Sequence, residues 1–411
     1  MSYPDWFRRL ASGWGADRPR ARTRKRKSVL ITAVSAALVV IAGVALLLVA
    51  PGKTTWWTTS VAASRQDGAK SAHPAPELQV TSVTPGSNSR GVNGTAPIQV
   101  GFSAPLARNS PPPRLSPSVP GSWTVDGTSA TFTPAAGFPG DTTVTLTDPG
   151  GSSGSRSAAG AKAGAGGYLA SGFTASFTTA SYSTLRLEQL LAQLGYLPLT
   201  WTPSGTAIQP SDTAGQLAAA YSPPSGSFSW HSGYPSVLHD FWSEGSDNLI
   251  VTGAVRAFQS EQGLTMDGVA GAQMWSDLLK AVAAGHSNGN GYTYALASKY
   301  LPETLTIWHD GREVLSTPAN TGIPEAPTAD GTFPVYERLP FQIMQGTNPD
   351  GSTYADPVSW VSYFDGGDAV HYFPRGSYGW PQSLGCVELP DSTAETAYGY
   401  LTYGSLVTVA G

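Results

Sequence analysis

The stretch HYFPRGSYGWPQSLGCVELP, residues 371–390, contains Cys386, the single cysteine of the 411-residue chain, and a histidine fifteen positions before it. His371 ends the apolar pair at 369–370, and Cys386 begins the short run VEL at 387–389, so each should lie at the end of a strand. A Pro- and Gly-rich loop joins the two ends. The stretch therefore predicts part of a β-rich domain in which an imidazole and a thiol meet at the edge of a sheet.

A cysteine with a neighbouring histidine has the elements of a nucleophilic catalyst. An ordinary thiol, with a pKa of about 8.5, is mostly protonated at neutral pH, so it needs a base such as His371. It also needs backbone N–H groups directed at the developing oxyanion. Gly385 allows close approach of a substrate and exposes its own amide and that of Cys386. The pattern favours acyl transfer by Cys386, and a buried, inert thiol is the alternative.

The same stretch resembles the L,D-transpeptidase catalytic domain (YkuD family), whose signature is a His, a loop, then Ser-x-Gly-Cys and an aliphatic residue. His371 matches the histidine, and Ser383, Gly385 and Cys386 match the remainder. DGREVLSTPANTGIPEAPTADGTFPVY and TYGSLVTVAG are also similar to family strands, at residues 310–336 and 402–411. The resemblance implies a mainly β catalytic domain at residues 291–411, with one helix before the last strand.

The resemblance also implies a mechanism. Cys386 attacks the carbonyl that precedes the terminal D-Ala of a peptidoglycan stem tetrapeptide, and His371 takes the thiol proton. The carbonyl of Tyr372 orients the imidazole, the amides of Gly385 and Cys386 hold the oxyanion, and Ser383 shapes the turn. The side-chain amine of a neighbouring stem then resolves the thioester and forms a 3→3 cross-link. No metal or cofactor is implied, and carbapenem-type inhibitors are expected to acylate the thiol.

Three positions depart from the family pattern. Leu384 stands where many members have His, Tyr372 replaces a Gly, and Glu388 replaces the usual Arg and so reverses a charge near the substrate. These changes suggest an altered peptide specificity. We expect Glu388 to line the substrate pocket together with two aromatic residues near loops, Tyr354 and Trp380.

Two other functions remain open on the sequence. Water could resolve the acyl-enzyme instead of an amine, which would make the chain an L,D-carboxypeptidase. In a different class, the chain could be a non-catalytic wall-binding scaffold, for which Cys386 would be dispensable.

The region before the catalytic domain is rich in short β-strands. Period-two alternation with Pro or Gly at the ends predicts strands at 78–85, 97–105, 122–134, 142–149 and 172–179. A flexible Gly- and Ser-rich loop is expected at 150–167. The pattern predicts an immunoglobulin-like β-sandwich at residues 77–180, and it resembles the bacterial domains that act as spacers before L,D-transpeptidase domains.

Residues 183–284 are expected to be helical. LRLEQLLAQLGYLP (185–198) has leucines at helical spacing and ends at Gly195. AVRAFQSEQGLTMDGVAGAQMWSDLL (254–279) predicts two more helices joined by a turn, and it resembles a peptidoglycan-binding module of three short helices. A Pro-, Ser- and Thr-rich insert after the first helix is longer than the usual loop. Peptidoglycan binding and a spacer role are both open for this module.

The N-terminus has the features of a membrane anchor. Residues 29–50 carry no charge, and a helix of this length spans about 33 Å, enough to cross the hydrocarbon core. Nine Lys and Arg precede it within residues 1–28, which places the N-terminus in the cytoplasm and the remainder outside the cell. Residues 51–76 then form a linker. A cleaved signal peptide is the alternative, but its apolar core is shorter and a small-residue cleavage site follows it closely.

Composition excludes other classes of function. After residue 50 the chain has 15 basic and 26 acidic residues, so the clustered positive charge that binds nucleic acid is missing. His231, His239 and His286 have irregular spacing without an HExxH or CxxC motif, so no metal site is predicted. The sequence as a whole predicts a multidomain, mainly β protein of the cell membrane, single-pass, that acts on the cell wall.

Overall fold

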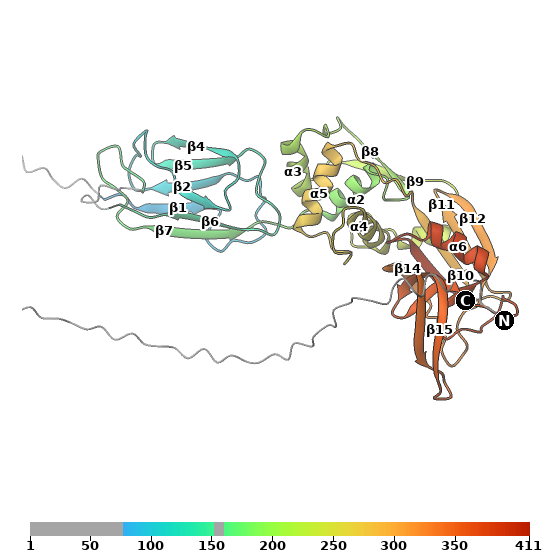
Figure 1. Ribbon diagram of the computed structural model, residues 1–411. Coiled ribbons are helices and arrows are strands. Elements are labelled where there is room, and N and C mark those ends of the chain that lie inside the picture. The colour runs from blue at the N-terminus through green and yellow to red at the C-terminus, as the bar shows by residue number, and fades with distance from the viewer. Residues whose placement is uncertain (1–76, 152–159) are drawn as a thin grey trace, which may run out of the picture. The chain divides into compact units, whose positions relative to one another are not determined.

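The computed structural model describes residues 77–151 and 160–411 (Figure 1). The basic tail, the apolar segment at 29–50 and the linker predicted for residues 1–76 lie outside the described residues. Within the described part of the chain, no helix has the length and apolarity that a membrane span requires. The predicted anchor therefore remains a prediction.

Residues 77–151 and 160–180 form a β-sandwich. One sheet has the order β1-β2-β5-β4 and the other the order β3-β6-β7, with all neighbours antiparallel. In β2, Ile98, Val100 and Phe102 are buried while the residues between them are more exposed, as period-two alternation predicts. They share a core with Val144 and Leu146 of β6. The strands are β1 (Val80–Thr84), β2 (Ile98–Phe102), β3 (Arg114–Ser116), β4 (Gly121–Asp126), β5 (Ser129–Pro134), β6 (Thr143–Asp148) and β7 (Phe173–Thr178).

The sandwich differs from the prediction in two places. β3 was not expected, because it has only three residues and prolines stand on both sides; it pairs as an edge strand with β6. The described part of the expected flexible loop is packed, since Ala161 and Ala163 are buried. The carboxylate of Asp148 accepts the N–H groups of Gly150 and Ala161 and so fixes this part of the loop.

The central region is helical, as its leucine spacing predicts. Leu187, Leu190 and Leu191 of the first helix are buried against Val255 and Phe258 of a later one. The Pro- and Ser-rich insert between them is ordered and adds a hairpin and two short helices. The elements are α2 (Thr184–Gln193), β8 (Leu199–Pro203), α3 (Thr213–Tyr221), β9 (Gly226–Trp230), the 3-10 helix η1 (Ser236–Phe241), α4 (Leu249–Glu261) and α5 (Ala272–Ala283).

The core of the helical region continues into the C-terminal domain. Tyr292, Tyr294 and Leu406 belong to the same buried cluster as the helices. A Cβ at Gly253 of α4 would lie 2.4 Å from the carbonyl oxygen of Gly404, so α4 lies directly against the turn before the last strand. Because the two regions share buried surface, the experiments below use the full-length chain.

The C-terminal domain contains two sheets and one helix. The first sheet has the order β12-β11-β10-β18-β13 and the second the order β14-β15-β16-β17. Val370, Val387 and Leu389 of the second sheet share a core with Ala394 and Ala397 of α6. The elements are β10 (Thr293–Ser298), β11 (Thr304–His309), β12 (Arg312–Pro318), β13 (Gly331–Pro334), β14 (Glu337–Thr347), β15 (Thr353–Asp365), β16 (Asp368–Tyr372), β17 (Val387–Leu389), α6 (Asp391–Tyr400) and β18 (Leu406–Ala410).

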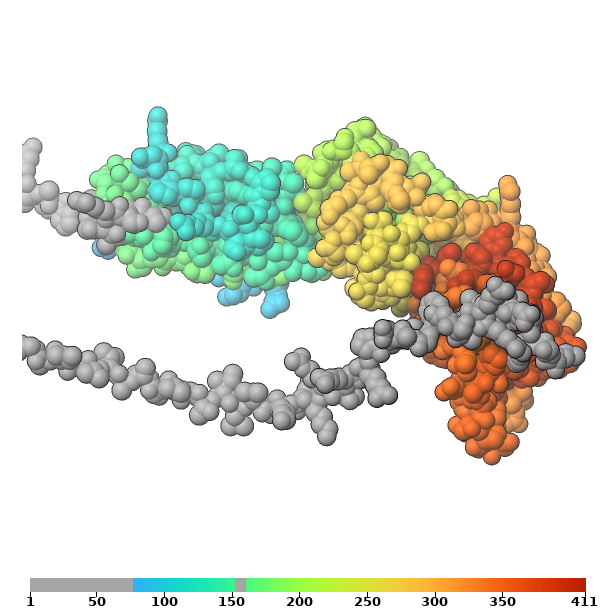
Figure 2. Space-filling model, viewed as in Figure 1, coloured from blue at the N-terminus to red at the C-terminus, as the bar shows by residue number. Residues whose placement is uncertain are grey.

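Two features of the second sheet position the site. β14 and β15 form a long hairpin that projects from the C-terminal domain, in orange in Figure 2. β16 and β17 run parallel, with His371 opposite Glu388. The two strand ends that the sequence predicts therefore lie side by side at the same edge.

Candidate active site

A cavity of about 490 Å³ lies on this sheet. Its wall comes from the β14–β15 hairpin, from β16 and from the loop that leads into β17. The wall includes the imidazole of His371 and the thiol of Cys386, and its charged side chains are those of Arg375, Asp356, Asp368 and Glu388. The cavity therefore contains both residues of the predicted catalytic pair and Glu388, which was also expected there. Arg375, Asp356 and Asp368 are charged side chains that the sequence did not place in it.

Strand register brings the imidazole and the thiol together. Because His371 lies opposite Glu388 in the parallel ladder, Cys386 lies opposite Ala369, two positions earlier. Residues two apart on a strand share a face, so His371 and Cys386 are diagonal neighbours on the face that lines the cavity.

Burial keeps both the imidazole of His371 and the thiol of Cys386 uncharged before the reaction. His371 is buried, which lowers the pKa of its imidazole, and its Nδ1 lies 3.0 Å from the carbonyl oxygen of Tyr372. A carbonyl only accepts, so Nδ1 carries the proton and Nε2 is left as a base. Burial raises the pKa of the Cys386 thiol to about 12, and the carboxylates of Asp368 and Glu388 add to the effect. The thiol must therefore lose its proton during the reaction itself.

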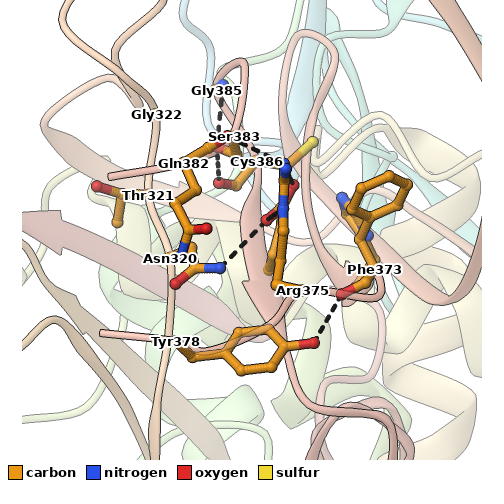
Figure 3. Close-up of polar contacts among 12 residues, drawn as sticks. Asn320, Thr321, Gly322, Phe373, Arg375, Tyr378, Gln382, Ser383, Gly385 and Cys386 are labelled. Atoms are coloured by element: carbon orange, nitrogen blue, oxygen red, sulfur yellow. Dashed lines mark hydrogen bonds and ion pairs between the residues drawn. The ribbon is translucent and has the colours of Figure 1, made fainter. Parts of the chain in front are cut away.

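The turn before the nucleophile is closed by Ser383 (Figure 3). Its hydroxyl donates to the carbonyl oxygen of Cys386 at 2.6 Å and accepts the N–H of Gly385 at 3.2 Å. The N–H of Gly385 is therefore directed at Ser383 in this structure. The oxyanion role expected for the amides of Gly385 and Cys386 stays a prediction. Gly385 has φ +120°, a conformation that L residues rarely adopt.

Glu388 is neutralised by a partner from the intervening loop. Nε and Nη2 of Arg375 each donate to one of its carboxylate oxygens at 2.7 Å, and Nδ2 of Asn320 donates a third bond at 3.3 Å. Arg375 also bonds to the carbonyl of Gln382 and lies over the ring of Phe373 (Figure 3). The expected reversal of charge is thus offset, because an arginine thirteen positions earlier stands beside Glu388.

Replacing Arg375 by Met is expected to destabilise the protein by about 3–5 kcal/mol, because it leaves the buried carboxylate of Glu388 unpaired. Adding Glu388→Gln should restore much of this loss, since a neutral amide tolerates the site better. Urea unfolding of the full-length chain measures both. Equal stabilities for the single and double variants would contradict the ion-pair argument.

The two aromatic residues expected in the pocket have different positions. Tyr354 lines the cavity from β15. Trp380 is 44% exposed and is not among the residues of the cavity wall, so this expectation is wrong. The N–H of the preceding Gly379 is bonded to Ala319 and Asn320, which fixes the loop on that side and leaves the indole in solvent.

No sequence pattern placed Asp368 and Arg375 in the site. Asp368 follows the turn DGG at 365–367, which reads as an ordinary hairpin signal. Arg375 lies in a loop whose path the sequence does not specify. The one available signal was Glu388, since a carboxylate in a predicted buried strand requires a partner.

Comparison with known proteins agrees with the domain pattern. Residues 294–409 match the family model of the L,D-transpeptidase catalytic domain (YkuD), and residues 75–179 match that of a bacterial Ig-like domain (Big_5). No curated protein matches the chain.

Several solved structures are similar to the chain. An L,D-transpeptidase from Mycobacterium smegmatis is 16% identical, over 82% of this chain and 100% of that one, with a TM-score of 0.27. L,D-transpeptidase 3 from Mycobacterium tuberculosis is 16% identical over 81% and 99%, with a TM-score of 0.27. The catalytic domain of an E. faecium L,D-transpeptidase is 28% identical over 29% and 96%, also with a TM-score of 0.27.

Proposed function

We propose, on the premise that residues 294–409 are an L,D-transpeptidase catalytic domain, that the chain forms 3→3 cross-links in peptidoglycan through a thioester on Cys386. The observation that carries the proposal is the placement of His371 and Cys386 as neighbours in the wall of one cavity. The hydrogen bond at Nδ1 of His371 leaves the other ring nitrogen as a base.

The proposed reaction has two halves. Nε2 of His371 takes the thiol proton as the sulfur attacks the carbonyl before the terminal D-Ala, and the imidazolium then protonates the leaving amine. The amide of Cys386 holds the oxyanion. In the second half, the side-chain amine of another stem attacks the thioester, and the thiol is regenerated. Once the acceptor amine is neutral, His371 carries the remaining proton from that amine to the sulfur.

The rest of the chain is proposed to place this domain at the wall. Residues 29–50 would anchor it in the cell membrane with the N-terminus in the cytoplasm, and the sandwich would act as a spacer. The helical module is proposed to bind peptidoglycan, because its resemblance is to modules of that kind. Carbapenem-type inhibitors should acylate Cys386.

Product analysis tests the proposal. The purified full-length chain is incubated with a disaccharide-tetrapeptide, and the products are separated and weighed. We expect cross-linked dimers that each lack one D-Ala, together with free D-Ala. Release of D-Ala without dimers would identify a carboxypeptidase instead. If neither product appears, the chain is better explained as a wall-binding scaffold.

A further inference from the structure

Asp368 lies beside the catalytic sulfur and has no part in the mechanism described above. The Sγ atom of Cys386 is 3.8 Å from the carbonyl oxygen of Gly367, and the N–H of Ala369 also bonds to the thiol. Residues on both sides of Asp368 thus contact the sulfur. A Cβ at position 385 would lie 2.3 Å from Oδ1 of Asp368, so the carboxylate fits directly against the residue before the nucleophile.

Asp368 faces the cavity without a cationic partner. Within residues 77–151 and 160–411, no Lys or Arg forms an ion pair with it. Arg375, the cation of the cavity wall, is held by Glu388. Burial and the nearby Asp365 raise the pKa of Asp368 to about 6, so at neutral pH the carboxyl is mostly ionised.

A carboxylate in this position opposes the first half of the reaction. Negative charge near a thiol disfavours the thiolate, and the pKa of Cys386 is raised in part by Asp368. An alanine or asparagine would not have this disadvantage. The position of Asp368 therefore suits a step that begins only after the sulfur is acylated. At that stage no thiolate has to form, so the negative charge of Asp368 no longer opposes the reaction.

We infer that Asp368 binds the side-chain ammonium group of the acyl acceptor and takes its first proton, an inference that rests on the proposed function. The acceptor amine is protonated in water at neutral pH and cannot attack in that form. An unpaired carboxylate beside the acyl-sulfur provides a charge-assisted hydrogen bond at the place where the amine must react. Water carries no charge and gains less from it, so Asp368 favours transfer to an amine over hydrolysis.

The proton balance of this step is complete. The ammonium group gives one proton to Asp368, and its nitrogen attacks the thioester carbonyl. The C–N bond forms as the C–S bond breaks, and the sulfur receives the second amine proton through His371. Asp368 then releases its proton to solvent, which restores the starting state of both residues.

Competition between two nucleophiles tests the inference. The full-length chain is acylated with a stem tetrapeptide and offered either a stem peptide with a cationic side-chain amine or hydroxylamine, which is uncharged at neutral pH. In Asp368→Asn, transfer to the cationic amine is expected to fall about tenfold or more, while release by hydroxylamine is unchanged. Glu395→Gln, which removes an exposed carboxylate of α6 outside the cavity wall, serves as the control and should change neither rate.

The outcomes separate the inference from the proposed function. Equal losses with both nucleophiles, or no loss with either, would overturn the role of Asp368. Acylation of the variant by a penem without a cationic side chain, followed by intact mass, reports whether the thiol and cavity are intact. If Asp368→Asn does not fold, Asp368→Ser removes the same charge. A wild-type chain that forms no thioester contradicts the proposed function as well.

Discussion

Replacing Cys386 by alanine is expected to abolish acylation by a carbapenem, and replacing His371 by alanine is expected to slow it by about 10²- to 10⁴-fold. The first change removes the only thiol of the chain. The second removes the base, and with a thiol pKa of about 12 almost no thiolate would remain at neutral pH. Intact mass of the full-length chain, followed over time with the inhibitor, measures both effects.

His309→Ala is the matched control for this experiment. His309 is another histidine of the catalytic domain; it is partly buried and bonded to Thr293, but it is not in the cavity wall. Its variant should form the adduct at the wild-type rate. An adduct on Cys386→Ala would place the nucleophile elsewhere, and a normal rate in His371→Ala would remove the histidine from the mechanism.

The catalytic pair could be predicted from the sequence because its geometry is local. The end of one strand, a loop and the beginning of the next strand all lie within twenty residues. Parallel pairing of these two strands is enough to bring His371 near Cys386. Asp368 could not be predicted in the same way. The turn DGG between β15 and β16 signals a hairpin, but the position of Asp368 against Gly385 also depends on the path of the following loop, which has no residue pattern of its own.

The ion pair of Glu388 with Arg375 is a second feature of the site that could not be predicted from the sequence. The sequence indicates that the charge of Glu388 departs from the family pattern, but not that Arg375 offsets it, because loop residues have no periodicity that fixes their direction. The identity of one residue was therefore a poor guide to the charge of the site. The total charge of the side chains in the cavity wall decides which substrate groups are attracted. That total can be obtained only when the fold shows which side chains line the cavity.

The same contrast holds for the fold. The strands of the sandwich and helices α2, α4 and α5 could be predicted, because the apolar periodicity of each one is visible within its own segment of sequence. The insert at 199–248 is rich in Pro, Ser and Thr and reads as a loop, yet Trp201, Phe228 and Trp242 form a chain of ring contacts across it. Each ring comes from a different short segment, so the cluster exists only once the segments meet.

Gly385→Ala is expected to reduce acylation by about 100-fold or more, because a shift of about 1 Å at the reacting atom has an effect of that size. The added Cβ would lie 2.3 Å from Oδ1 and 3.0 Å from Cγ of Asp368, and the φ of +120° is unfavourable for alanine. Relieving either the contact with Asp368 or the unfavourable φ would move the backbone that carries the sulfur. The rate of adduct formation with a carbapenem, beside a thermal unfolding curve, measures the loss and its structural part.

Gly376→Ala is the control, since it lies in the same loop and a Cβ there meets nothing within 4 Å. It should react at the wild-type rate. Adding Asp368→Ala to Gly385→Ala removes the contact but keeps the unfavourable φ, so it should recover only part of the rate. Full recovery would show that the carboxylate alone requires glycine, and no recovery would show that the backbone conformation does. A normal rate in the single variant would contradict both arguments, since the turn would then hold the nucleophile without needing a glycine.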